Sequence, residues 1–394
     1  MKILLCALEA SADALGAALM KALRENRPDV EFIGCGGALM EKQGLKSLFD
    51  IAPFSVLGPV AALSLLPRAL KAADALAELA AEEKPSCAIF IDSWSFARIA
   101  AEKFERKAPE VKRFKYVAPQ VWASRPKRAE KAARLFNGVM CLFDFETPYF
   151  EKAGAKARFV GHPGFQAARD RKIDRAVFRR KFGLGEGPLL AVLPGSRASE
   201  LARLGAPFRE TVQRAAEAVS DLRIVIPAAP SVAKDLPDYL AGWPGAPVIV
   251  EGEDRLDAFA AADAALAASG TAAAELAIMG TPMVIAYKLD FLTEMWVRAI
   301  FTIRYAALAN IAADREVIPE FLQRRCRADL MAPALIALLE GGPAREAQLS
   351  ALPEIVRGWT GGARPAAEMA ADAVLDWLKG EKAQMPIESA AERP

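Results

Sequence analysis

Two carboxylates stand directly after apolar runs that are typical of buried strands, and a carboxylate in that place can act as a general base. Asp92 ends the run CAIFID, and Glu9 follows the first apolar run, residues 2–7. Apolar neighbours raise the pKa of such a group into the range in which it accepts a proton from a hydroxyl. The competing interpretation of both residues is a helix cap, a role that Ser11 would also fill well after Glu9.

A glycine, a hydroxyl and a guanidinium in the segment LPGSR could bind phosphate. Gly195 permits close approach of the backbone to a ligand, and Ser196 adds a hydroxyl. Arg197 supplies a planar cation that can bind a phosphate through two hydrogen bonds. The segment lacks the GxxxxGK[ST] spacing of a Walker A loop. An ordinary strand–helix turn is the competing interpretation.

The segment SGTAAAE opens a predicted helix and offers a second phosphate contact. Ser269, Gly270 and Thr271 stand at its start, where free backbone N–H groups suit a diphosphate. Glu275, about one turn later, can accept hydrogen bonds from both hydroxyls of a ribose. A capped helix with a favourable acid in its first turn is the alternative. Because both segments fall in the same half of the chain, a nucleotide diphosphate is the favoured ligand.

A basic run interleaved with aromatic residues lies between residues 112 and 134. The chain carries 51 basic and 49 acidic side chains, and that near balance opposes a nucleic-acid binder. A membrane headgroup or a phosphorylated lipid fits the run better, while a solvated helix face is the alternative. The cations are Lys112, Arg113, Lys115, Arg125, Lys127, Arg128, Lys131 and Arg134, and the aromatic residues are Phe114, Tyr116 and Trp122.

The most apolar stretch is residues 54–66, which is too short to span a bilayer and contains a glycine and a proline. Arg68 and Lys71 follow it, and an apolar segment followed by cations suits docking at a membrane surface. A helix of the protein core is the alternative. The first apolar run faintly resembles a secretion signal, but Glu9 interrupts it, so we interpret that run as a buried strand.

Composition limits both the fold and the chemistry. The chain has 394 residues, 53% hydrophobic and 25% charged, so it forms a large core in two domains or three. Its five scattered cysteines indicate reduced thiols. The single histidine, His162, excludes a metal site with two imidazoles. We interpret Glu146, in the segment DFE, as the start of a helix, and we expect no metal and no other cofactor.

Short apolar runs alternate with helical patterns, which is typical of parallel sheets covered by helices on both faces. The sequence therefore predicts an α/β protein with two Rossmann-like, doubly wound domains that face a cleft, with ligands beyond the carboxyl ends of the strands. In the first half we predict strands at 2–7, 30–33, 87–92, 113–118, 138–143 and 157–160, and helices at 11–25, 68–83, 126–135 and 146–153. After a linker with an entry helix near 165–185, we predict a strand followed by a loop at 189–195, strands at 223–227, 247–250, 264–267 and 282–287, and helices at 205–219, 231–241, 255–262 and 271–279.

Several segments, taken in order, resemble the motifs of the lipid-A-disaccharide synthase family, bacterial glycosyltransferases of the two-domain GT-B type. They are LEASAD at 8–13, SVLG at 55–58 with LLPR at 65–68, YVAPQVWASR at 116–125, FVGHP at 159–163, LPGSR at 193–197, SGTAAAE at 269–275 and ANIAADREVIPEFLQ at 309–323. The resemblance runs from about residue 2 to residue 340. Motifs of this length in the same order are far more specific than any one of them.

The resemblance implies an inverting hexosyltransferase that needs no metal. It would transfer the sugar of UDP-2,3-diacylglucosamine to 2,3-diacylglucosamine 1-phosphate, and form the β-1,6-linked lipid A disaccharide 1-phosphate and UDP. Matched by motif, Asp92 is the base and Glu9 lies by the reacting sugar. The residues on the UDP side are then Gly195, Ser196, Arg197, Ser269, Gly270, Thr271, Glu275 and Asn310, and further candidates for the cleft are Ser11, Trp122, Arg125 and His162.

The same resemblance implies a domain plan and a cellular place. An acceptor-binding and membrane-facing domain would span 1–165, and a UDP-sugar domain would span 185–345. Helices at 346–378 would pack back on the first domain, and 380–394 would be a flexible tail. The enzyme would be cytoplasmic, bound peripherally to the inner face of the cytoplasmic membrane, and a homodimer is a further expectation.

The chain departs from the family pattern beside Asp92. The family's GIDAPDFN reads FIDSWSFA here, so Asp92 is kept while Ser95 and Ala97 replace an aspartate and an asparagine. These changes concern acceptor binding and rate more than fold. Two other functions stay open. One is another UDP-sugar enzyme of the same fold, such as an epimerase, and the other is a non-catalytic paralogue that binds a nucleotide sugar or a lipid.

Overall fold

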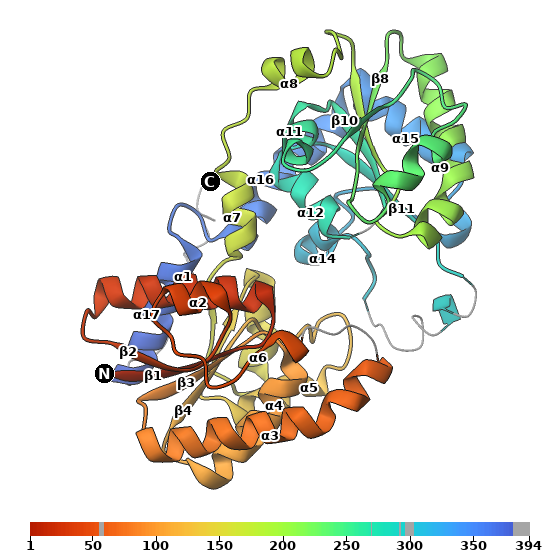
Figure 1. Cartoon of the computed structure of the whole chain (residues 1–394). Coiled ribbons are helices and arrows are strands. Elements are labelled where there is room, and N and C mark those ends of the chain that lie inside the picture. Colours follow the sequence, from red (N-terminus) through yellow and green to blue (C-terminus); the bar gives the residue numbers. More distant parts are fainter. Residues whose placement is uncertain (55–58, 269, 291–292, 296–302, 381–394) are drawn as a thin grey trace. The chain divides into compact units, whose positions relative to one another are not determined.

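The chain folds into two compact units, each built around one parallel sheet (Figure 1). Unit 1 comprises Met1–Pro163 together with the chain from Trp359 onward, and unit 2 comprises Gly164–Gly358. The computed structural model describes residues 1–54, 59–268, 270–290, 293–295 and 303–380. Two six-stranded parallel sheets with flanking helices confirm the predicted pair of Rossmann-like, doubly wound domains.

The sheet of unit 1 has the strand order β2-β1-β3-β4-β5-β6. The chain first winds outward from β1 to β2 and then crosses back to β3, so the winding direction reverses between β1 and β3. Open α/β sheets bind ligands beyond the carboxyl ends of the strands at such a switch point. Its strands are β1 (Lys2–Ala7), β2 (Glu31–Cys35), β3 (Cys87–Ile91), β4 (Lys112–Tyr116), β5 (Gly138–Cys141) and β6 (Ala157–Phe159).

The sheet of unit 2 has the order β12-β11-β10-β7-β8-β9, with its switch point between β7 and β10. The segment LPGSR follows β7 and the segment SGTAAAE follows β10, so both predicted phosphate contacts stand at this switch point. Its strands are β7 (Leu189–Leu193), β8 (Arg223–Pro227), β9 (Val248–Val250), β10 (Ala264–Ala268), β11 (Met283–Tyr287) and β12 (Glu320–Leu322).

Helices cover both faces of each sheet. In unit 1, α3, α4 and α5 pack on one face, and α1 and α17 pack on the other. The helices of unit 1 are α1 (Ala10–Asn26), α2 (Ala38–Lys42), α3 (Pro59–Glu83), α4 (Trp94–Lys107), α5 (Lys127–Leu135), α6 (Thr147–Lys152) and α17 (Ala366–Lys379). The remaining helices are α7 (Pro163–Arg169), α8 (Arg175–Lys181), α9 (Ala198–Ala218), α10 (Leu236–Tyr239), α11 (Asp254–Ala261), α12 (Thr271–Ile278), α14 (Leu308–Ala313), α15 (Ala328–Glu340) and α16 (Pro343–Thr360).

The last described helix, α17, completes the core of unit 1. The ring of Trp377 lies 5.2 Å from that of Phe114 on β4, centroid to centroid. A Cβ at Gly138 would come within 2.5 Å of the Trp377 ring, so only glycine leaves room for this contact. At the end of α17, Lys112 donates hydrogen bonds to the carbonyls of Trp377 and Leu378, which places a cation at the negative end of the helix.

Some observed elements differ from those predicted. The helix predicted at 231–241 is a single 3₁₀ turn, Ala233–Asp235, followed by the short α10. The helix predicted at 205–219 begins seven residues earlier, at Ala198. The short edge strand β12 has no alternating apolar pattern in the sequence, and the sequence analysis missed it. The entry helix expected within the linker is α8, whose first turn is capped by the carboxylate of Asp174.

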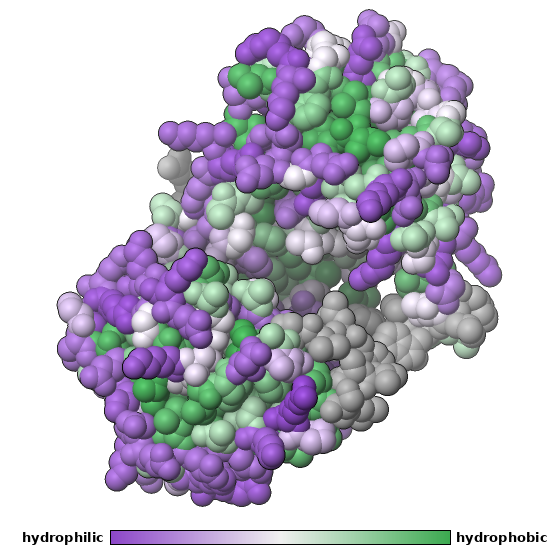
Figure 2. All heavy atoms as spheres, in the orientation of Figure 1, coloured by the Kyte–Doolittle hydropathy of each residue, from purple (hydrophilic) through white to green (hydrophobic). Residues whose placement is uncertain are grey.

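One face of the molecule is largely hydrophilic. On the face that Figure 2 shows, hydrophilic side chains cover the outer helices of both units, and hydrophobic ones gather in smaller areas between them. Of the helices in the described part of the chain, none combines the length and the apolar character needed to cross a bilayer.

Candidate active site

Glu9 and Asp92 lie together at the switch point of unit 1. Ala7 pairs with Ile91 in the parallel ladder between β1 and β3, so the two loops leave the sheet side by side. Burial raises the pKa of Glu9 above its ordinary value, and the negative charge of Asp92 raises it further. No hydrogen-bond or ion-pair partner for either carboxylate occurs among the residues that the structure describes. Both groups are therefore free to meet a substrate.

Neither carboxylate caps a helix. Glu9 occupies the N-cap position of α1, but its side chain makes no capping hydrogen bond. Ser93, not Asp92, is the N-cap residue of α4. Ser11 lies exposed in the first turn of α1, two residues after the N-cap position that its type suggested. The capping interpretation is thus wrong for Asp92, and Glu9 holds the cap position without using its side chain.

The backbone at Asp92 is strained. Asp92 has a φ of +52° and Ser93 a φ of +37°, in the left-handed region that L-residues rarely adopt. Val117, after β4, has a φ of +69°. Such strain persists only where surrounding contacts enforce it, and it concentrates at functional sites. The turn after β3 therefore holds Asp92 in a fixed place.

Lys115, on β4, supplies the contact that enforces this turn. Its fully buried ammonium donates hydrogen bonds to the carbonyl oxygens of Asp92 at 2.6 Å, Tyr116 at 2.9 Å and Phe90 at 3.3 Å. Burial lowers the pKa of Lys115 to about 7, while the charge of Asp92 opposes that change. Three carbonyl acceptors match the three donors of an ammonium, and this geometry favours the charged form. The sequence analysis missed this role and placed Lys115 on the surface.

A second buried polar group, Asp13, shapes the loop after β2. Its carboxylate accepts hydrogen bonds from the N–H groups of Gly37, Leu39 and Met40 at 2.8 to 3.1 Å. A Cβ at Gly37 would come within 2.8 Å of Asp13, so the approach requires glycine there. The loop borders a hollow of about 360 Å³ that Ser47, Phe49 and neighbouring residues line.

Trp122 and His162 are held from within unit 1. The indole of Trp122 donates a hydrogen bond of 3.0 Å to the carboxylate of Glu146, whose other oxygen accepts one from the N–H of Phe143. Burial raises the pKa of Glu146 to about 7. The ring of His162 stacks on Phe143, and burial lowers its pKa. Its backbone N–H donates to the carbonyl of Trp359 at 2.8 Å, where the chain re-enters the unit.

In unit 2, Glu200 organises the loop that contains Gly195, Ser196 and Arg197. Its buried carboxylate accepts hydrogen bonds from the N–H of Ser196 at 2.8 Å and from the guanidinium of Arg197 at 3.1 Å. Gly195 has a φ of +119°, and a Cβ there would come within 2.5 Å of Glu200. The Arg197 side chain is 73% exposed despite this ion pair, so it can still reach a ligand.

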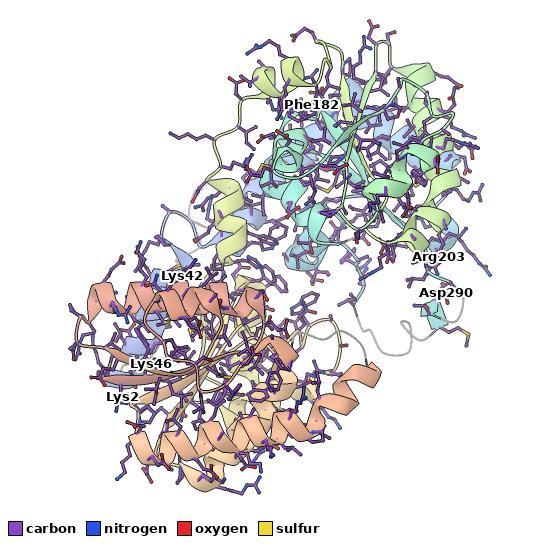
Figure 3. The ribbon with its side chains drawn as sticks, viewed as in Figure 1. Lys2, Lys42, Lys46, Phe182, Arg203 and Asp290 are labelled. Atoms are coloured by element: carbon purple, nitrogen blue, oxygen red, sulfur yellow. The ribbon has the colours of Figure 1, made fainter. Side chains whose placement is uncertain are left out.

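The end of β11 is tied to the same helix, α9. The hydroxyl of Tyr287 donates a 2.9 Å hydrogen bond to Glu200. Beyond it, Arg203 and Asp290 form an ion pair of 3.2 Å, and Figure 3 shows the two side chains close together. Neither Glu200 nor Tyr287 stood out in the sequence. Glu200 could have been found by its place three residues after Arg197, in the first turn of a helix.

The start of α12 lies exposed after the end of β10. Gly270, with a φ of +149°, is its N-cap residue and makes no side-chain cap, and Thr271 is exposed in the first turn. Half-buried Glu275 lies 3.5 Å from Arg255, and burial raises its pKa while Arg255 opposes the shift. Ser269 lies outside the described residues. An uncapped helix start suits a diphosphate, as the sequence predicted.

Asn310 has a structural place in unit 2. Its fully buried amide donates to the carbonyl of Ile318 and to Glu320, and its oxygen accepts from the N–H groups of Val317 and Ile318. All of these bonds lie within the loop that leads into β12, so the side chain anchors that edge strand. Asn310 was expected on the UDP side, and the structure gives it four hydrogen bonds to three residues of unit 2.

The predicted basic run does not form one surface. Lys112 binds the end of α17, Arg113 donates to the carbonyl of Leu135, and Lys115 is buried under Asp92. Phe114 and Tyr116 are also fully buried. The later cations, from Arg125 onward, remain near the surface. Among the described residues, no three side chains of His, Cys, Asp or Glu come together in an arrangement that could hold a metal ion.

Comparisons with known proteins agree with these motifs. The model of the family described as lipid-A-disaccharide synthetase matches residues 3–374. The lipid-A-disaccharide synthase of Ruegeria pomeroyi is 39% identical over 393 residues, covering 96% of both chains. That of Rhodospirillum centenum is 40% identical over 378 residues, covering 95% of this chain and 94% of the relative.

Solved structures with little sequence identity share the fold. MurG of Acinetobacter baumannii superposes with a TM-score of 0.56 at 14% identity, covering 96% of this chain and 99% of that chain. A UDP-GlcNAc 2-epimerase from Neisseria meningitidis, solved with UDP-GlcNAc, superposes with a TM-score of 0.58 at 12% identity, covering 97% and 100%. At this identity the likeness establishes the GT-B fold alone.

Proposed function

Because the chain belongs to the lipid-A-disaccharide synthetase family, we propose that it condenses UDP-2,3-diacylglucosamine with 2,3-diacylglucosamine 1-phosphate. The products are the β-1,6-linked lipid A disaccharide 1-phosphate and UDP. The chain is thus a hexosyltransferase of lipid A biosynthesis, and the proposal concerns its substrates and the residues that act on them. The unpartnered carboxylate of Asp92, at the switch point of unit 1, is the observation that carries it.

The proposed chemistry is a single displacement. The acceptor's 6-hydroxyl loses its proton to the carboxylate of Asp92 as its oxygen attacks the anomeric carbon of the donor. The bond from that carbon to the diphosphate oxygen breaks on the opposite side, so the configuration inverts and UDP leaves with the bonding electrons. Lys115 holds the Asp92 turn by its hydrogen bond to the carbonyl oxygen of Asp92. Glu9 lies beside Asp92, where its carboxylate can bind a sugar hydroxyl.

The nucleotide is assigned to unit 2. The uncapped N–H groups at Gly270 and Thr271 and the exposed guanidinium of Arg197 are suited to the diphosphate of UDP. They stabilise the negative charge that develops as UDP departs. Glu275, one turn into α12, is placed for the ribose hydroxyls. The proposal gives Glu200 a positioning role, since it holds the backbone N–H of Ser196 and the side chain of Arg197.

The acyl chains of both substrates require the enzyme to work at a membrane surface. Leu66 and Leu70, four residues apart on α3, are 43% and 39% exposed. Arg68 lies between the two leucines in the sequence, and Lys71 follows them. This pattern is typical of a helix that docks at a membrane interface. We place this docking at the inner face of the cytoplasmic membrane. A homodimer belongs to the same proposal, and sedimentation of the purified protein tests it.

The test is an assay in neutral detergent micelles with both proposed substrates and EDTA. Wild type forms disaccharide and UDP, and Asp92→Asn loses about 100-fold or more in kcat, as expected for a lost general base. Glu110→Gln, an exposed acid before β4, serves as the matched control. Epimerised UDP-sugar without disaccharide would instead favour an epimerase. UDP binding by a folded wild type that forms no product would favour a non-catalytic paralogue.

A further inference from the structure

A hollow of about 370 Å³ in unit 1 is lined almost entirely by cations and lies directly beside the Asp92 turn. Five of its seven lining residues are basic, and no carboxylate lines it. The lining consists of Trp94, Ser95, Arg98, Arg125, Lys127, Arg128 and Lys131. Glu102, outside this lining, pairs with both Arg98 at 3.2 Å and Lys131 at 2.9 Å. The cluster therefore keeps an excess of positive charge.

Three of the five cations have no carboxylate partner. Within the described ranges, no acidic side chain comes within 4.0 Å of Arg125, Lys127 or Arg128. Burial and the neighbouring charge of Arg125 lower the pKa of Arg128 from its ordinary value. Like charges gathered without a counter-charge repel one another, so the empty cluster is electrostatically unfavourable. A bound anion would remove that repulsion.

The backbone adds positive electrostatic potential at the same hollow. Lys127 and Arg128 form the first turn of α5, where the positive end of the helix disfavours cations, and no side chain caps this end. Trp94 and Ser95 form the first turn of α4, whose N-cap likewise makes no side-chain bond. Arg125 has a φ of +55°, in the left-handed region in which strain concentrates at functional sites. Two helix starts and a strained arginine point positive charge at one hollow.

The hollow is close to the proposed base. Asp92 and Ser95 are three positions apart in the sequence, so their Cα atoms lie at most about 11 Å apart. In the proposed acceptor, a single sugar ring separates the 6-hydroxyl from the phosphate at carbon 1. A site that holds the phosphate in the hollow can therefore present the hydroxyl to Asp92. Ser95, which replaces an acid of the family pattern, brings a hydroxyl to this hollow without negative charge.

We propose that this hollow, the Arg125–Arg128 pocket, binds the phosphate monoester of the glycolipid acceptor. The inference rests on the proposed function, since it assigns the acceptor's phosphate to a place beside the proposed base. Arg125 and Arg128 bind the phosphate oxygens through paired N–H groups, and Lys127 and Lys131 add charge at the rim. The pocket thereby selects an acceptor with a free 1-phosphate and sets the orientation of its 6-hydroxyl.

The test compares two acceptors, one with the 1-phosphate and one with a free 1-hydroxyl, in neutral detergent micelles. In wild type the phosphorylated acceptor has a KM at least tenfold lower than the other. Arg125→Gln/Arg128→Gln raises the KM of the phosphorylated acceptor about tenfold or more, as expected for lost charge-assisted hydrogen bonds. The same change alters the KM of the phosphate-free acceptor less than twofold. Arg106→Gln, an exposed cation near the end of α4, changes neither.

A measurement of acceptor binding provides a second test that does not depend on turnover. The affinity of each acceptor is measured without donor, and the tenfold preference for the phosphorylated form disappears in the double variant. If the double variant fails to fold, seen as a lost thermal unfolding transition in circular dichroism, the single change Lys127→Gln, at an exposed position, replaces it. A wild type that binds the two acceptors differently but forms no disaccharide overturns the proposed function and leaves the pocket standing.

Two results would overturn the pocket itself. An equal loss with both acceptors would mean that Arg125 and Arg128 act on structure and not on phosphate. The second is a loss of binding to vesicles of anionic phospholipid with an unchanged preference between acceptors in micelles. That outcome would assign the cluster to the membrane headgroups instead.

Discussion

Glu200 joins three groups that come from different parts of unit 2. Its carboxylate accepts from the N–H of Ser196, the guanidinium of Arg197 and the hydroxyl of Tyr287. A glutamine at this position would keep only one side-chain oxygen. Its NH₂ group would then face an N–H or O–H donor that the carboxylate of Glu200 now accepts from. Glu200→Gln therefore weakens UDP binding about tenfold, the scale of one charge-assisted hydrogen bond. Calorimetric titration with UDP measures this, with Glu210→Gln on the exposed face of α9 as the control. Equal affinity in wild type and Glu200→Gln would remove Glu200 from the site.

Glu146 makes the stability of unit 1 depend on pH. Its pKa is raised from 4.5 to about 7 by burial in the fold. Between these values the folded chain binds more protons than the unfolded chain, so the free energy of unfolding falls as pH rises. Glu146→Gln disturbs the hydrogen bonds of this side chain. It also removes the titrating carboxyl group, and with it the dependence of unfolding free energy on pH. The stability difference between wild type and variant will thus be largest near pH 5 and shrink by roughly 3 kcal/mol towards pH 8.

Denaturant unfolding of both proteins at several pH values checks this prediction. Lys115, whose lowered pKa gives stability that rises with pH above about 7, is present in both proteins and cancels in the comparison. A stability difference that stays constant from pH 5 to pH 8 would show that Glu146 is already ionised in the folded protein at the acid end.

Single residues were predictable where their position along the chain fixes their place in the fold. Asp92 and Gly195 follow buried strands, and parallel strands put such residues at one edge of a sheet. Lys115 and Glu200 were not predictable in their roles, because each acts through contacts with strands and loops distant in sequence. Asn310 was assigned by its motif, and its four hydrogen bonds within unit 2 became visible only in the fold.

At the scale of elements, periodicity located most strands and helices, and failed where an element is short. β12 has three residues, too few to show alternation. α17 was predicted as a helix in a C-terminal segment. It packs on β4 and β5 because the ring of Trp377 contacts Phe114 and occupies the space that Gly138 leaves by having no side chain. No local pattern reveals that a helix at the end of the chain completes a sheet at its beginning.

The contact between α17 and β5 gives a prediction about stability. Trp377→Ala removes a large buried ring, and we expect it to lower the free energy of unfolding of unit 1 by about 3–5 kcal/mol. Gly138→Ala also destabilises wild type, since its Cβ would come within 2.5 Å of the Trp377 ring. In the Trp377→Ala background the same alanine meets free space and costs much less. A double-mutant cycle by chemical unfolding measures this coupling, and additive effects would contradict the packing described.

At the scale of the whole molecule, the net charge of +2 provides little general attraction to an anionic bilayer, so local features must direct membrane docking. Leu66 and Leu70 provide such a feature on α3, in the unit that carries Asp92. Burial of one leucine contributes about 1.5–3 kcal/mol, so loss of both from an interface is easily measured. Leu66→Asp/Leu70→Asp therefore lowers partitioning onto vesicles that contain anionic lipid at least tenfold.

The matched control is Leu330→Asp/Leu349→Asp, which changes two leucines in unit 2, each 40% exposed. This control leaves partitioning unchanged if docking belongs to α3, whereas an equal loss in both double variants would mean that exposed leucines bind lipid wherever they lie. Turnover of substrates dispersed in micelles separates docking from folding damage, because Asp92 and the exposed leucines of α3 lie in the same unit. A variant that binds UDP normally, turns over substrates dispersed in micelles and fails only on vesicles places the docking surface on α3 and separates it from the chemistry at Asp92.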